Sequence, residues 1–251
     1  MSLQAINLTA GYRAKPIVAD VTLTARHGAV TTLVGANGSG KSTLLRTLTG
    51  AQQPLAGKAL INGCPIADLS AAARARLISV VFTDRSGGGG LTVSQLVAIG
   101  RHPYSGFLGR LTPDDRHAVA AALESVGLSH KSGDFVASLS DGERQKAMIA
   151  RAIAQQAPVM VLDEPTSFLD VSARFEIMAL LRDIADSGTT VILSTHDIAP
   201  ALAVSDDIWA IVNRQVVAGE RDEVIADGIL DQVYRGAAFD PASLDFKPLQ
   251  P

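Results

Sequence analysis

The sequence predicts an α/β protein with a mostly parallel sheet, an N-terminal antiparallel β subdomain and an inserted helical subdomain. Three observations support this fold class. Short, partly alternating apolar stretches fill residues 3–33, as in antiparallel strands. Later, buried-type apolar runs alternate with amphipathic helical stretches, which is typical of a parallel sheet covered on both faces. Between these regions, signals for helix starts crowd residues 85–156.

Composition excludes several classes of protein. The chain has 251 residues, 47% of them hydrophobic, so it can bury a sizeable core. A formal charge of -3 gives no basic field for nucleic acid, which we do not expect as a partner. The single cysteine, Cys64, lies in a turn and suggests no disulfide, metal site or nucleophile. No apolar run approaches the roughly 18 residues of a spanning helix, so we expect the chain not to cross a membrane alone.

A glycine-rich stretch between an apolar run and a helical run forms the centre of the sequence. Its residues are Gly35, Ala36, Asn37, Gly38, Ser39, Gly40, Lys41, Ser42 and Thr43. The pattern G-x-x-x-x-G-K-[ST] predicts a phosphate-binding loop, whose backbone N–H groups and helix start face the anion. Lys41 would contact the β- and γ-phosphates, and the Ser42 hydroxyl would ligate Mg²⁺. An ordinary strand-to-helix turn is the alternative, but it does not require a lysine and two hydroxyls after the last glycine.

The N-terminal part then continues with further short elements. Asn62-Gly63 between apolar flanks predicts a β-hairpin. Ser70 is a predicted N-cap of a short helix, and the apolar run 78–82 predicts a buried strand. That strand delivers Thr83 to the edge of the core.

The composition changes at residues 85–90, which include four consecutive glycines. Three helix starts follow: capping boxes begin at Thr92 and Ser140, and Thr112-Pro113-Asp114-Asp115 caps the helix between them, while Gly100 is a predicted helix stop. We therefore expect a helical subdomain at 85–156, inserted into a nucleotide-binding core of residues 1–84 and 157–251. Residues 237–251 show little periodicity and receive no assignment.

The second half of the core places polar residues at predicted strand ends. The buried strand 159–162 ends in Asp163 and Glu164, and the strand 190–194 ends just before His196. In an open parallel sheet, strand carboxyl ends share one edge, so these residues can converge with the phosphate loop. Asp163 would then hold Mg²⁺ and Glu164 would be the general base. The alternatives are a solvent-boundary acidic pair for Asp163 and Glu164 and a satisfied core histidine for His196.

A second motif follows the helical segment: Leu139-Ser140-Asp141-Gly142-Glu143, or L-S-x-G-E. With the phosphate loop, the Asp-Glu pair and the later histidine, this order resembles the ATP-binding cassette ATPases over residues 3–217. The resemblance implies a phosphate-loop NTPase core and a head-to-tail homodimer with two ATP molecules between the subunits. Independently, Ser140 is an N-cap, so the helix end beyond it offers N–H donors to a phosphate. Gly142 allows close backbone approach.

The resemblance also implies residue roles. By position, they are Tyr12 for adenine stacking, Lys41 as phosphate clamp, Ser42 and Asp163 for Mg²⁺, Glu164 as base, Asp170 in the intersubunit loop, and His196 for the γ-phosphate. From its own position alone, Tyr12 fits a packed aromatic residue on a strand as well as it fits an adenine-stacking residue. Two positions depart from the pattern. Asp141 replaces a glycine, and Thr83 stands where the family usually has a glutamine that reaches Mg²⁺.

A further segment, Gly100-Arg101-His102-Pro103-Tyr104, resembles the G-R-x-P-Y segment of ATPases that serve importers of iron-siderophore, haem and cobalamin type. The alternative is a Pro/Gly turn between helices. The implied function is ATP hydrolysis that drives polytopic permease subunits. An extracytoplasmic substrate-binding protein would act on the permease, and this chain would form a homodimer at the cytoplasmic face of the inner membrane. A soluble cassette ATPase, for example in iron-sulfur cluster assembly, is the alternative. An ATP-dependent regulatory module would require a lost base, yet Glu164 is present.

Overall fold

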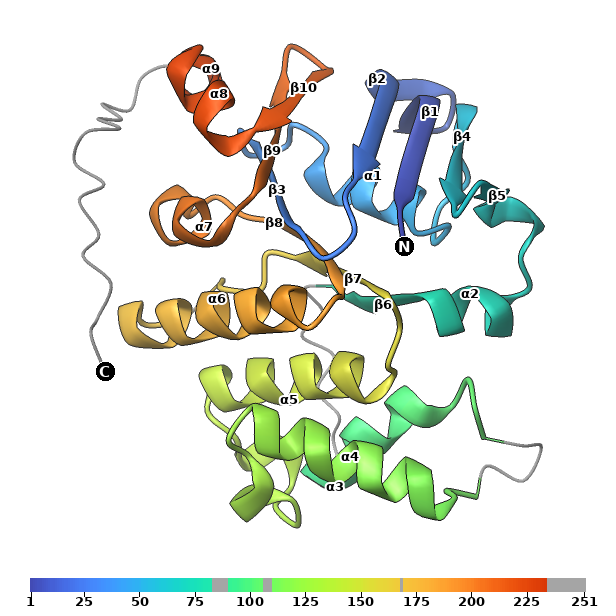
Figure 1. Ribbon diagram of the computed structural model, residues 1–251, viewed down its shortest axis with the longest axis vertical. Helices are drawn as coiled ribbons and strands as arrows, with labels where there is room; N and C mark the ends of the chain where they lie inside the picture. Colours follow the sequence, from blue (N-terminus) through green and yellow to red (C-terminus); the bar gives the residue numbers. More distant parts are fainter. Residues whose placement is uncertain (83–89, 106–109, 168, 234–251) are drawn as a thin grey trace.

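The structure, a computed structural model, describes residues 1–82, 90–105, 110–167 and 169–233. Two sheets form the upper part of the molecule in Figure 1, and a group of helices lies below them. Across the described ranges, every helix is too short or too polar to span a bilayer. The fold is an α/β fold with an antiparallel N-terminal sheet, a mostly parallel second sheet and a helical insertion, as the sequence predicts.

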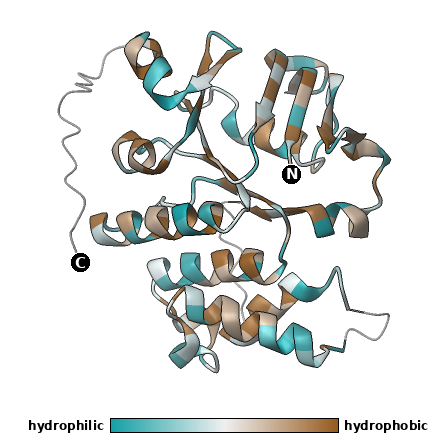
Figure 2. Cartoon of the chain, in the orientation of Figure 1, coloured by the Kyte–Doolittle hydropathy of each residue, from teal (hydrophilic) through white to brown (hydrophobic). Residues whose placement is uncertain are grey.

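The first sheet is antiparallel, with the strand order β2-β1-β4-β5. Its strands are β1 (Leu3–Tyr12), β2 (Lys15–Ala25), β4 (Ala56–Ile61) and β5 (Cys64–Pro65). Hydrophobic and hydrophilic residues alternate along β1 and β2 in Figure 2, because one face of the sheet packs on the core. The predicted hairpin is confirmed: Asn62 and Gly63 connect β4 and β5 with φ angles of 50° and 78°.

The second sheet has the order β10-β9-β3-β8-β7-β6, and only its edge strand β10 is antiparallel. Its strands are β3 (Val30–Gly35), β6 (Ile78–Val81), β7 (Val159–Asp163), β8 (Thr190–Ser194), β9 (Asp207–Val212) and β10 (Gln215–Glu220). Every residue of β3, β7 and β8 is buried, which explains their continuous apolar runs. The prediction of antiparallel strands over residues 3–33 is therefore confirmed for β1 and β2 and wrong for β3, which pairs in parallel with β8 and β9.

Helices cover the parallel sheet and form the insertion. They are α1 (Lys41–Leu48), α2 (Ala71–Leu77), α3 (Val93–Ala98), α4 (Pro113–Ser125), α5 (Asp141–Ala154), α6 (Val171–Asp186), α7 (Ile198–Val204), α8 (Arg221–Ala226) and α9 (Ile229–Val233). Helices α3, α4 and α5 share a hydrophobic core of their own. The predicted N-caps are confirmed, since Thr92, Thr112 and Ser140 each accept a hydrogen bond from the N–H three residues on and complete a capping box.

Gly100 follows the end of α3, as predicted for a helix stop, and it is also a position of close packing. Helix α3 ends at Ala98, and Gly100 lies inside a following 3₁₀ turn, Ile99–Arg101. A Cβ atom at Gly100 would lie 2.2 Å from the carbonyl oxygen of Arg151 on α5. The α-helix therefore ends just before Gly100, as predicted, and the glycine itself is required by the close packing of two chain segments.

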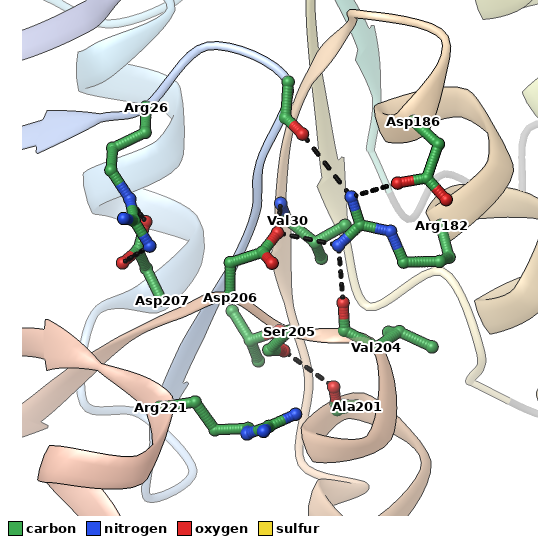
Figure 3. A network of polar contacts seen from close by, with 12 residues as sticks. Arg26, Val30, Arg182, Asp186, Ala201, Val204, Ser205, Asp206, Asp207 and Arg221 are labelled. Atoms are coloured by element: carbon green, nitrogen blue, oxygen red, sulfur yellow. Dashed lines mark hydrogen bonds and ion pairs between the residues drawn. The ribbon is translucent and has the colours of Figure 1, made fainter.

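A polar network fixes the start of β3, the strand that leads into the phosphate loop (Figure 3). The carboxylate of Asp206 accepts hydrogen bonds from the Val30 N–H at 2.8 Å and from Arg182 of α6 at 2.7 Å. Beside it, Arg26 makes a two-point contact with Asp207, with both N···O distances 2.8 Å. Such bidentate pairs define orientation as well as distance. The network therefore ties β3 to α6 and β9.

Candidate functional site

The phosphate-loop residues, Asp163, Glu164 and His196 come together at the carboxyl edge of the parallel sheet. Strands β3, β8 and β7 are neighbours, and Asp163 of β7 pairs in register with Ser194 of β8. Gly35 ends β3, so the phosphate-loop sequence leaves the same edge. This is the edge at which open α/β sheets bind ligands. Thr83 lies outside the described residues.

The glycine-rich loop has the backbone that its sequence predicts. Gly40 has a φ of +108°, and a Cβ atom there would lie 2.5 Å from Cγ2 of Ile17. Helix α1 begins at the next residue, so its free N–H groups face the loop. The buried Oγ of Ser39 has no hydrogen-bond partner among the described residues. A cavity of about 420 Å³ lies against Gly38 and Ser39. A loop with an open cavity and an orphaned hydroxyl suits a polar ligand.

The remaining loop residues differ in their exposure. Asn37 and Gly38 are exposed, Ser42 is half-buried, and Thr43 is buried at the start of α1. At Gly35 a Cβ atom would lie 2.5 Å from the Ser39 hydroxyl. The loop is therefore closely packed at its base and open at its tip.

Lys41 is the buried cation of the site. Only 7% of its surface is exposed, and Nζ donates a hydrogen bond of 2.9 Å to the carbonyl oxygen of Gly35. Nζ also lies 3.5 Å from Oε1 of Glu164. A buried ammonium needs such partners, because leaving it unpaired away from water is costly. The contacts place the lysine between the loop and the acidic end of β7.

Asp163 and Glu164 are both anchored to Ser194. The hydroxyl of Ser194 donates to Oδ1 of the buried Asp163 at 2.6 Å and accepts from the Glu164 N–H at 3.1 Å. Glu164 has a φ of +54°, a left-handed conformation that is uncommon outside glycine and collects at functional sites. The strained backbone directs the Glu164 side chain toward Lys41.

His196 is exposed, so the interpretation as a core histidine is wrong. Its side chain is 55% exposed, and Nδ1 lies 2.5 Å from Oε2 of Glu164. The neighbouring Asp197 is held by Arg174 of α6 at 2.7 Å. The histidine therefore lies at the solvent-exposed edge of the site, and its Nδ1 atom contacts the carboxylate of the predicted base, Glu164.

The donors fit a magnesium nucleotide. Asp163 offers a carboxylate and Ser42 a hydroxyl, the oxygen ligands that Mg²⁺ prefers when phosphate oxygens and water complete its shell. Across the described residues, no group of three or more His, Cys, Asp or Glu side chains could hold a metal on its own.

The L-S-x-G-E motif forms the start of α5. The Ser140 hydroxyl accepts from the Glu143 N–H at 3.3 Å and donates to Oε2 of Glu143 at 2.9 Å. Asp141 is exposed and pairs with Arg144 at 3.5 Å. At Gly142 a Cβ atom would meet only ordinary contacts, the nearest being Cβ of Ala173 at 3.8 Å. Nothing within the described chain requires a glycine at that position.

Tyr12 and Asp170 make none of the side-chain contacts that join Lys41, Asp163, Glu164 and His196 at the sheet edge. Tyr12 ends β1 opposite Lys15 and is 46% exposed, so it is not a core aromatic residue. Asp170 is the N-cap of α6, and its carboxylate accepts from the Ala173 N–H at 2.8 Å. The cavity beside the phosphate loop is lined by neither of them.

The G-R-x-P-Y segment is a packing motif within the chain. Arg101 is buried. Its guanidinium donates a hydrogen bond of 2.8 Å to the carboxylate of Asp115 of α4 and one of 2.7 Å to the carbonyl oxygen of Ala154 of α5. Its guanidinium lies 4.2 Å from the ring centroid of Tyr104, and Arg76 of α2 lies 5.6 Å from the same centroid. The segment therefore joins the insertion to α2.

Sequence reasoning missed three side chains that orient the site. They are Ser194, which holds Asp163 and Glu164, Arg174, which holds Asp197, and Lys131, which lies 2.5 Å from Glu143. A serine at the end of a strand beside the Asp-Glu strand was a usable signal for the first. The other two pairs connect residues more than ten positions apart, and no local pattern indicates them.

Comparison with known proteins identifies the class of this fold and site. Residues 18–167 match the family described as ABC transporter. An uncharacterized ABC transporter ATP-binding protein of Methanocaldococcus jannaschii is 38% identical over 92% of this chain and 81% of its own. The chain belongs to the ABC transporter family and is an ATP-binding subunit, an ATPase whose hydrolysis is coupled to transport.

Two further relatives have more specific names. The probable siderophore transport system ATP-binding protein YusV of Bacillus subtilis is 35% identical, over 93% of this chain and 87% of its own. The iron(3+)-hydroxamate import ATP-binding protein FhuC of the same organism is also 35% identical, over 93% of this chain and 88% of its own.

Two solved structures have the same fold. One, described as an inward-facing metal-chelate type ABC transporter, has a TM-score of 0.82 and 27% identity and covers 93% of this chain and 89% of its own. A dimeric ABC transporter cassette, MJ0796, has a TM-score of 0.77 and 26% identity over 87% of this chain and 98% of its own. Cassettes of this family dimerise and pair with permease subunits.

Proposed function

We propose that this protein is the ATP-hydrolysing subunit of an importer for a metal chelate of iron-siderophore, haem or cobalamin type. The observation that carries the proposal is the meeting of Lys41, Asp163, Glu164 and His196 at one sheet edge beside the phosphate loop. The names of the relatives that mention siderophore and iron-hydroxamate transport support the substrate class. The resemblance of the G-R-x-P-Y segment agrees with it.

The loop and α1 bind the triphosphate in this proposal. Backbone N–H groups of the glycine-rich loop and the start of α1 surround the phosphates, and the buried ammonium of Lys41 adds the charge. The hydroxyl of Ser39, orphaned in the described chain, gains an acceptor. Ser42, Asp163 and Thr83 would hold Mg²⁺, which when bound neutralises phosphate charge. Thr83 is shorter than the usual glutamine, so a bridging water would complete its contact.

Glu164 is the proposed general base. Its carboxylate lies between Lys41 and His196, and the strained backbone holds it there. An ionised carboxylate in this position can accept a proton from water that attacks the γ-phosphate. His196, exposed at the edge of the site and in contact with Glu164, would contact the γ-phosphate and orient Glu164.

The remaining site residues act across a head-to-tail dimer in this proposal. Ser140 and the N–H groups at Gly142 would receive the γ-phosphate of ATP bound to the other subunit. The absence of any packing reason for Gly142 within the described chain supports an external one. Asp170 would lie in the intersubunit loop, and the exposed ring of Tyr12 would stack on adenine.

The proposal extends to partners and location. The dimer would bind polytopic permease subunits at the cytoplasmic face of the inner membrane, with an extracytoplasmic binding protein delivering the chelate. We also propose that the functional subdomains are 1–84 with 157–251 and the insert 85–156.

Co-purification tests this function. The full chain, carrying an affinity tag, is isolated from native membranes and its partners are identified by mass spectrometry. A polytopic membrane protein at stoichiometric amount is the expected result. Soluble scaffold partners alone would favour the cluster-assembly class and overturn the transport proposal.

A further inference from the structure

The phosphate-facing end of α5 carries two acidic residues, Asp141 and Glu143. Acidic side chains stabilise a helix start through its dipole, but they repel an approaching anion. Each of the two has a basic partner. Arg144 lies 3.5 Å from Asp141, and Lys131 lies 2.5 Å from Glu143. The second pair is the closer one and joins residues from different elements.

Glu143 is the acidic residue in direct contact with Ser140. Its Oε2 accepts from both the N–H and the hydroxyl of Ser140, at 3.0 Å and 2.9 Å. Its Oε1 faces Lys131. The hydrogen bond from Lys131, followed by those from Ser140, lowers the pKa of Glu143 to about 2, so its charge persists at neutral pH. A full negative charge therefore lies within hydrogen-bond distance of the hydroxyl proposed to meet a phosphate.

Lys131 is held in place by its own segment. It ends a 3₁₀ turn, Ser129–Lys131, in the connection between α4 and α5. The backbone of this connection is attached to α3, because the N–H groups of Val93 and Ser94 donate to the carbonyl oxygens of Asp134 and Ser132. The hydrogen bonds to α3 therefore fix the turn that carries Lys131, and this lysine belongs to none of the sequence motifs described above.

We propose that Lys131 is a positioning residue for the head-to-tail dimer, in which ATP lies between two copies of this chain. The ammonium of Lys131 neutralises the charge of Glu143. Ser140 and the start of α5 can then receive the γ-phosphate of ATP bound to the second copy. The inference rests on the proposed function. Without Lys131, the Glu143 carboxylate would oppose the incoming triphosphate as a like charge. Both side chains of the pair are half-buried, at 28% and 29% exposure, so losing the pair should also lower folding stability somewhat, and stability is therefore measured beside dimerisation.

Measuring folding stability and association separately makes the test specific. The parent protein is the full chain with Glu164→Gln, in which ATP-bound dimers are expected to accumulate. Lys131→Met should weaken ATP- and Mg²⁺-dependent dimerisation by about tenfold or more, through like-charge repulsion. Binding of a fluorescent ATP analogue to the monomer should stay as in the parent, and the melting temperature should fall only slightly, so that the variant is fully folded at the assay temperature. Analytical ultracentrifugation gives the dimer Kd.

Three further variants separate charge from structure. Glu143→Gln added to Lys131→Met should restore dimerisation, because glutamine keeps the capping box without the charge. Lys131→Arg should behave as the parent. Lys146→Met is the matched control, since it removes another lysine pair of α5, the 2.6 Å contact with Glu176, without touching Glu143.

The inference is overturned if Lys131→Met dimerises as tightly as the parent, or if the double variant is not rescued. A loss equal in Lys146→Met would likewise reject it. Failure of the parent itself to dimerise with ATP would instead reject the proposed function, and the inference with it. The two failures are distinguishable because one appears in the parent and the other only in the variants.

Discussion

Nδ1 of His196 lies 2.5 Å from Oε2 of Glu164, while Oε1 of the same carboxylate lies 3.5 Å from Nζ of Lys41. The two oxygens of Glu164 are thus shared between a cation from α1 and an imidazole that follows β8. A carboxylate held from two sides has a defined orientation, which is what proton transfer from a bound water needs. Neutralising Glu164 should consequently affect chemistry more than nucleotide binding.

We expect Glu164→Gln to bind MgATP, to lose turnover by about a hundredfold or more, and to accumulate as an ATP-bound dimer. The amide keeps the shape of the side chain and removes its basicity. Gel filtration with ATP and Mg²⁺ and a phosphate-release assay measure the two effects. Glu124→Gln, exposed on α4, is the control and should behave as wild type. A Glu164→Gln protein that stays monomeric, or that keeps wild-type turnover, would show that Glu164 is not the base.

Gly142→Ala should separate folding from association. Glycine costs up to about 1 kcal/mol relative to alanine inside a helix, and a Cβ at this position meets only contacts of 3.8 Å and more. The variant should therefore be as stable as wild type or slightly more stable. In the Glu164→Gln background, its ATP-dependent dimer should nevertheless be weaker, since the added methyl group occupies the surface proposed to face a phosphate. A loss of stability together with unchanged dimerisation would reverse this interpretation.

Local patterns in the sequence predicted the backbone of the site well. The phosphate loop, the strand ends at Asp163 and Ser194, and the capping box at Ser140 depend on neighbours within a few residues. Such features are determined by backbone geometry and by side-chain hydrogen bonds to nearby N–H groups. The parallel strands were predictable as well, because a strand that is buried on both faces has an unbroken run of apolar residues.

Contacts between distant segments were not predictable in this way. The Lys131–Glu143 pair and the hydrogen bond from Ser194 to Asp163 depend on which elements become neighbours in the fold. Gly100 illustrates the same limit: as a glycine after a helical run it suggests a helix stop. Its second role was not predictable: the Arg151 carbonyl oxygen of another helix leaves no room for a side chain.

The Arg101–Asp115 contact should give the insertion a pH-dependent stability. Hydrogen bonds from the Thr112 backbone, then from Arg101, lower the pKa of Asp115 from 3.8 to about 2. Because the folded pKa is the lower one, this stabilisation is fully present above the unfolded pKa of 3.8 and is lost as the pH falls toward 2. Asp115→Asn should be less stable than wild type at pH 7, and the difference should shrink as the pH falls below about 4.

Urea unfolding at several pH values between 7 and 3 measures this difference. Asp114→Asn, an exposed substitution on the same helical turn, serves as the control and should show no comparable pH trend. A stability difference for Asp115→Asn that stays constant or widens on acidification would contradict the proposed origin of its effect.

Two glycines with similar backbone strain allow a last test of the phosphate loop. Gly40 has a φ of +108° and Gly63 of the β4–β5 turn has a φ of +78°, so an alanine is strained at both. They differ in surroundings: a Cβ at Gly40 would lie 2.5 Å from Ile17 and 2.8 Å from Val18, whereas nothing lies within 4 Å of a Cβ at Gly63. Gly63→Ala should therefore cost about 1 kcal/mol of stability and leave ATP binding unchanged. Gly40→Ala must move the loop or β2, and we expect it to lose ATP binding as well. Fluorescent nucleotide titration with thermal unfolding compares the two variants, and wild-type ATP affinity in Gly40→Ala would show that the loop conformation does not determine nucleotide binding.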